Sequence, residues 1–101
     1  MIFKEDIRNR IQNDFSTNAN EAFEILKHAI EKTDALNSDR LIRCIIFLAN
    51  GNVDELNKYV KVATADPRDI MLWAEYEGLL DNQKYKRLRD FSRIFEESSM
   101  E

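Results

Sequence analysis

Residues that interrupt helices are scarce in this chain, and they stand between runs of periodic apolar residues. Only two glycines, Gly51 and Gly78, and one proline, Pro67, occur among the 101 residues. Glu, Lys, Leu, Ile and Ala, which favour helix by intrinsic preference, are abundant. No stretch alternates apolar and polar residues between turn residues, as a half-buried strand would. We therefore expect an all-α protein with no strand.

Six short helices are predicted from the helical spacing of apolar residues and from start and stop signals. Asn18, Asn52 and Asp66 are placed to cap helix N-termini, and Pro67 suits the first position of the helix that follows Asp66. The expected helices span 3–14, 19–34, 39–50, 53–65, 67–77 and 82–97.

The length allows a single helical domain over 1–101, in which residues 97–101 are expected to fray. Loops of about two to five residues between the helices are typical of antiparallel neighbours. Two arrangements fit these helical hairpins. One is a compact bundle, and the other is a small α-solenoid stack of the HEAT/TPR-like kind. A search for an internal repeat finds no match longer than one helical turn.

Composition bears on the class and location of the protein. The single cysteine cannot form an internal disulfide, and no run of about 18 apolar residues could span a membrane. The N-terminus lacks the basic and then apolar pattern of a signal peptide. We expect a cytoplasmic protein without membrane association, and the net charge of -4 predicts attraction to basic partners.

His28, the only histidine, shares a helix face with Glu21, Glu24 and Glu31. Carboxylates and an imidazole on one face raise the hypothesis of a metal-binding or enzymatic protein. The Glu-x-x-His motif of di-iron bundles is absent, because Ile25 stands three residues before His28. This face lies opposite the apolar stripe of 19–34, so we interpret it as a solvent-exposed charged face and expect no metal.

Cys44 lies inside the apolar run of 39–50, whereas a reactive thiol needs exposure and an electropositive setting. We therefore expect a buried, unreactive cysteine. The sequence also lacks a glycine-rich phosphate loop, a nucleophile elbow and a zinc-protease helix motif. We predict that the protein is not an enzyme and takes no cofactor.

Lys86, Arg89 and Arg93 are three and four residues apart within the helix expected over 82–97, and would form one basic stripe. Such a stripe could bind phosphates, which makes a nucleic-acid-associated protein an alternative function. The pI of about 5.1 argues against it, because nucleic-acid-binding domains commonly have a pI above about 9. Ion pairs with acids of the preceding segment are the simpler interpretation.

The helix expected over 67–77 is apolar on every side, which leaves two interpretations. It is either a central helix together with 39–50, or it presents an interface. Aromatic residues and methionine are enriched at interface cores, and two further apolar residues point away from the stripes of their helices. We predict a small non-catalytic protein–protein interaction module that self-associates or binds a partner, with an inhibitor or immunity-type protein as one variant. Its candidate contact residues are Met71, Trp73, Tyr76, Val62 and Ile94.

Overall fold

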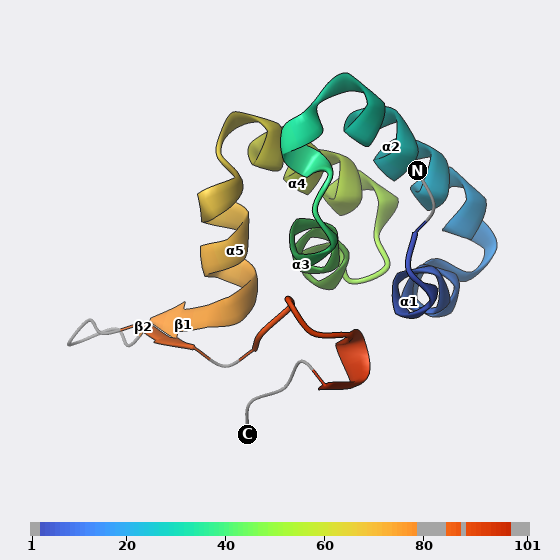
Figure 1. Cartoon of the computed structure of the whole chain (residues 1–101). Helices are drawn as coiled ribbons and strands as arrows, with labels where there is room; N and C mark the ends of the chain where they lie inside the picture. The colour runs from blue at the N-terminus through green and yellow to red at the C-terminus, as the bar shows by residue number, and fades with distance from the viewer. Residues whose placement is uncertain (1–2, 79–84, 88, 98–101) are drawn as a thin grey trace.

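The computed structural model describes residues 3–78, 85–87 and 89–97, and most of these residues are helical (Figure 1). The expected helical class is confirmed. Two short strands and three 3₁₀ turns accompany five α-helices within the described residues. The α-helices are α1 Glu5–Phe15, α2 Ala19–Lys32, α3 Asp39–Ala49, α4 Val53–Ala65 and α5 Pro67–Glu75. The 3₁₀ turns are η1 Ser16–Asn18, η2 Asp34–Leu36 and η3 Phe95–Glu97, and the strands are β1 Tyr76–Gly78 and β2 Tyr85–Arg87.

Three helices begin where a polar side chain caps the first turn. Ser38, Asn52 and Asp66 each accept a first-turn backbone N–H, at 3.3, 2.9 and 3.0 Å respectively. These bonds satisfy donors that have no partner inside the helix. Asn18 makes no such side-chain bond, so its predicted capping role is wrong, although α2 does begin at Ala19.

The central helix is α3, as the sequence predicted for 39–50. It packs against α1, α4 and α5, while α2 contacts α1 and α4 (Figure 1). Every side chain from Leu41 to Ile46 is buried. The hydrophobic core therefore forms around α3, and the other four helices cover it.

The turn between α3 and α4 also contacts α1. Asn50 and Gly51 both have positive φ, at 49° and 81°. A Cβ at position 51 would lie 2.5 Å from the backbone carbonyl oxygen of Asp14. Only glycine permits this approach together with this backbone conformation. The glycine thus lets the α3–α4 turn pack against the last turn of α1.

The structure contradicts the predicted C-terminal helix over 82–97. Residues 85–87 form β2, which pairs antiparallel with β1 so that Tyr76 stands opposite Arg87. The expectation of no strand is therefore wrong, and α5 ends at Glu75 instead of residue 77. From residue 89 the chain runs below α3 toward α1 (Figure 1), and the described part of the chain ends in η3. Residues 82–84 and 88 of that predicted helix, and 98–101 of the expected frayed end, lie outside the described residues.

Apolar side chains from all five α-helices and from the C-terminal part of the chain make one core. Phe91 is the C-terminal contribution, at 1% exposure. Its ring lies 5.3 Å from that of Phe47 in α3 and 5.7 Å from that of Phe95, measured between centroids. Among the described residues, no helix has both the length and the apolar character needed to cross a bilayer.

Candidate functional site

The most polar part of the protein interior surrounds Arg43, which projects from α3. Arg43 is 4% exposed, and its guanidinium donates to both carboxylate oxygens of Asp6 in α1, at 2.9 and 3.1 Å. Its Nη1 donates to the backbone carbonyl of Phe91 at 3.0 Å. Buried charges are tolerated when they are paired and hydrogen-bonded in this way. Arg43 therefore joins α1 and α3 to residues 89–97, which we call the C-terminal segment.

A second buried carboxylate, Glu75 at the end of α5, holds the same segment. It is fully buried and accepts two hydrogen bonds from Arg40, at 3.0 and 2.5 Å. It also accepts the backbone N–H of Phe91 at 2.8 Å, and Asp6 accepts that of Phe95 at 3.1 Å. Carboxylates thus take the place that helical carbonyls would have as partners for these N–H groups. This is the physical reason why the predicted C-terminal helix does not form here.

The electrostatic setting of Asp6 suits a structural role. Burial raises the pKa of Asp6, but hydrogen bonds from Arg43 and from the Phe95 N–H, with the nearby positive charge, outweigh it. The net pKa lies below the ordinary value of 3.8. A general acid or base works best with a pKa near the working pH and with a free partner site. In the described part of the chain, every buried side-chain nitrogen and oxygen has a hydrogen-bond partner. We interpret this charged cluster as what holds the C-terminal segment in place.

The basic stripe predicted for nucleic-acid binding does not form, because its residues do not share a helix. Lys86 lies in β2, paired with Glu77 of β1. Arg93 lies after the strand, in irregular structure, and its guanidinium is 3.7 Å from the Asp90 carboxylate. The spacing of three and four residues aligns side chains only on a helix. The prediction of a basic stripe, on which the nucleic-acid alternative depends, is therefore wrong.

Arg89, the third residue of that stripe, serves the fold. Its Nε donates to the backbone carbonyl of Ala74 at 2.7 Å, near the C-terminus of α5. Its guanidinium carbon lies 4.5 Å from the centre of the Phe47 ring. A cation is favoured at a helix C-terminus and over an aromatic face. A phosphate would have to compete with both contacts.

The face that raised the metal hypothesis is exposed, as predicted. Glu24, His28 and Glu31 of α2 are all exposed. Within the described residues, no group of three or more His, Cys, Asp and Glu side chains is close enough to hold a metal ion. Cys44 has no exposed surface, which confirms the prediction that it is buried.

An exposed aromatic contact lies where α4 meets α5. Trp73 is 47% exposed, although Ile70 and Ala74 of the same helix are completely buried in the core. Its ring meets the half-buried Tyr59 of α4 edge to face, with centroids 6.3 Å apart and planes at 69°. Val62 is half-buried one turn after Tyr59. We call Tyr59, Val62 and Trp73 the aromatic patch.

The other predicted contact residues are Met71, Tyr76 and Ile94. Met71 is half-buried and packs against the core, and Tyr76 is half-buried in β1. Ile94 is 40% exposed in the C-terminal segment, where it lines a shallow depression with Lys4 and Asn9. The helix predicted over 67–77 is thus neither wholly internal nor wholly an interface.

Two features of the structure, the contact of Tyr59 and the buried charge of Arg43, lie outside the sequence predictions. Helical periodicity places Tyr59 on the apolar face of 53–65, but its contact with Trp73 depends on how α4 and α5 pack. Arg43 is the single polar residue between Leu41 and Ala49. A lone cation in an otherwise apolar helix requires a buried anion, and this requirement was the available signal for Asp6.

Comparisons of this chain with protein-family models, with curated proteins and with solved structures find no match.

Proposed function

We propose that this chain is a small non-catalytic protein-binding module that contacts a protein partner, or a second copy of itself, through the aromatic patch. The exposure of Trp73 carries the proposal. It is the only tryptophan in the chain, and 47% of its surface faces solvent beside a partly buried tyrosine. Tryptophan and tyrosine are the side chains most enriched at energetic hot spots of interfaces.

The setting of the patch favours binding because its side chains are already ordered. Ile70 and Ala74 anchor α5 in the core, and Asp66 and Pro67 define its first turn. The contact with Tyr59 then limits the freedom of the Trp73 ring. A side chain ordered before binding loses less conformational entropy on association.

The charge of the chain supports a basic class of protein partner. The net charge of -4 would steer the protein toward a basic protein surface. A small inhibitor or immunity-type protein is one form that such a module takes. A HEAT/TPR-like stack is a further proposal for the architecture. Its support is that α1–α2 and α3–α4 are successive helix pairs joined through a contact between α2 and α4.

Self-association is tested first, by light scattering coupled to size exclusion over a range of concentrations. If a second copy covers the patch, the mass approaches twice 11.9 kDa and quenching of Trp73 fluorescence by acrylamide falls together with dimer formation. Trp73→Ala then yields a monomer that retains its helical circular dichroism. Ile94→Ala is the matched control, because Ile94 is similarly exposed but lies outside the patch.

If the chain is a monomer at all concentrations, the next test is for a partner that is a different protein. Affinity capture from the native source is then compared between the original chain, Trp73→Ala and Ile94→Ala. We expect one protein to be captured by the original chain and by Ile94→Ala but not by Trp73→Ala. Equal capture by all three chains, or a catalytic activity that survives Trp73→Ala, would contradict the proposal.

A further inference from the structure

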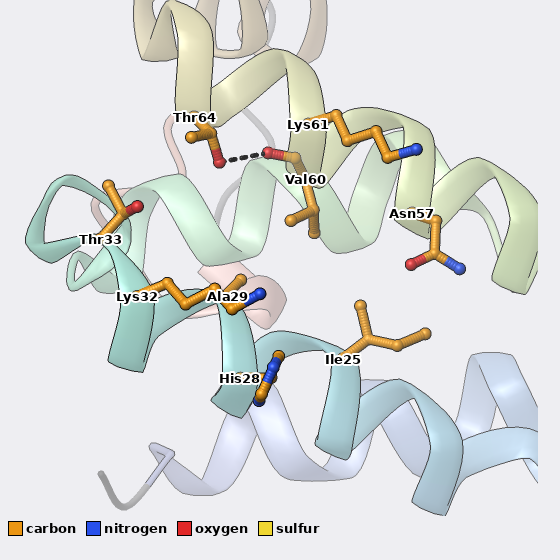
Figure 2. Close-up of a pocket in the computed structure, with 9 residues that line it drawn as sticks. All are labelled: Ile25, His28, Ala29, Lys32, Thr33, Asn57, Val60, Lys61 and Thr64. Carbon is orange, nitrogen blue, oxygen red and sulfur yellow. Dashed lines mark hydrogen bonds between the residues drawn. The ribbon is translucent and has the colours of Figure 1, made fainter.

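An open groove lies along the side of α4 that faces away from the aromatic patch. No sequence prediction anticipated it. It lies between α2 and α4 and has a volume of about 400 Å³. Figure 2 shows Ile25 of α2 and Val60 of α4 pointing into the space between the helices. The lining residues are Ile25, His28, Ala29, Lys32, Thr33, Asn57, Val60, Lys61 and Thr64.

The neutral polar residues on the α4 wall already bond to their own helix. The Thr64 hydroxyl donates to the backbone carbonyl of Val60 at 2.9 Å (Figure 2). The Asn57 amide donates to the carbonyl of Val53 at 3.3 Å. A ligand would therefore meet an apolar floor formed by Ile25, Ala29 and Val60, and basic side chains at the rim.

The rim is positive, although the protein as a whole is acidic. Lys32 and Lys61 line the groove from its two helices, with His28 beside them, and in the described part of the chain none of the lining residues is acidic. Among the described residues, neither lysine forms an ion pair. The groove thus combines apolar surface with unpaired positive charge, and an apolar ligand with negative charge would complement both features.

We propose that the α2–α4 groove docks an acidic amphipathic helix of a partner protein. The lining residues cover about two turns of each wall, or about 12 Å of helix. A helix of that length presents two apolar anchors at positions i and i+4 to the floor, the arrangement used by helix-in-groove complexes. Its carboxylates would lie beside Lys32 and Lys61. This site is separate from the aromatic patch, so either proposal can fail without the other.

The test uses two fluorescently labelled helical peptides with identical leucine anchors, one with glutamates and one with lysines on its polar positions. Anisotropy titration of the full chain should show binding of the glutamate peptide alone, weakening as salt is added. Lys61→Glu should weaken this binding by about tenfold or more, and Val60→Asp should abolish it. Lys27→Glu makes the same charge change on an exposed position of α2 outside the groove and should have little effect.

Several results would overturn the inference. Equal binding of both peptides, no binding, or equal weakening by Lys61→Glu and Lys27→Glu would each exclude an acidic helix in this groove. Displacement of the peptide by laurate at concentrations well below those at which it forms micelles would assign the groove to a small anionic amphiphile instead. A dimer that Val60→Asp dissociates would assign it to a second copy of the chain. Trp73→Ala should bind the peptide normally, which keeps this test distinct from that of the aromatic patch.

Discussion

The helical body, α1 to α5, and the C-terminal segment are held by different forces. Inside the body, side chains such as Ile42, Ile45 and Leu56 are fully buried among other apolar groups. The C-terminal segment has one deeply buried apolar anchor, Phe91, and its backbone bonds to the charged side chains of Asp6, Arg43 and Glu75.

This difference has a consequence for conformation. Apolar burial is nearly non-directional, so α3 can keep its regular helical geometry while burying almost every side chain. Hydrogen bonds to charged groups are directional and strong. The backbone of the C-terminal segment therefore follows the positions of the three charged side chains rather than its own helical preference.

Arg43→Ala should have the largest effect, because it leaves Asp6 buried without its partner and frees the Phe91 carbonyl. We expect a loss of about 3–5 kcal/mol in the free energy of unfolding, measured by urea denaturation. The double variant Arg43→Ala/Asp6→Ala should recover part of it, since the unpaired charge is then gone. Arg8→Ala, an exposed change on α1, is the control. A loss of similar size with Arg8→Ala would refute this interpretation.

Leu56→Ala should destabilise the body by about 3 kcal/mol, through lost burial and a cavity. It leaves the charged contacts of the C-terminal segment in place. Amide hydrogen exchange can separate the two regions, since Phe91 and Phe95 donate their N–H groups to carboxylates. Under conditions of local exchange, Arg43→Ala should accelerate these two amides and Leu56→Ala should not. Equal acceleration would show that the regions open as one unit.

Acid should weaken the C-terminal segment before the body. The folded pKa of Asp6 is lowered, so its contribution to stability is present above the ordinary pKa of 3.8 and is lost as pH falls through the folded value. Urea denaturation between about pH 6 and pH 2.5 should show this loss, with faster exchange of the Phe95 amide. Asp6→Asn should lower stability at neutral pH and flatten the acid dependence. An unchanged slope in Asp6→Asn would assign the acid effect to other groups.

Asn52→Ala should have the smallest effect, about 1 kcal/mol, because it removes one cap hydrogen bond at the start of α4. The effect should stay within the helical body and leave the exchange of the Phe91 and Phe95 amides unchanged. Asn52→Asp, which keeps an accepting oxygen, should retain stability. Loss of stability in both variants would indicate that the cap bond is not the cause.

Local signals in the chain were enough to predict the helical body. Apolar residues at helical spacing placed all five helices, and Asn52 and Asp66 marked two of the helix starts within a residue. These signals depend on neighbours within one or two turns, so they can be recognised without knowing the fold. The exposed side of α2 and the burial of Cys44 followed from the same periodicity.

The C-terminal segment and both candidate surfaces depended on contacts between distant parts of the chain. Residues 82–97 have helical apolar spacing, but Asp6 and Glu75 are 89 and 16 residues away from the N–H groups they accept. The local helical preference of this segment is outweighed by hydrogen bonds to buried carboxylates, and the positions of these carboxylates are set by α1 and α5. The aromatic patch requires the packing of α5 on α4, and the groove requires that of α2 beside α4. Periodicity assigns a residue to a helix face, but the neighbour that covers or leaves that face open is set by the packing of whole helices.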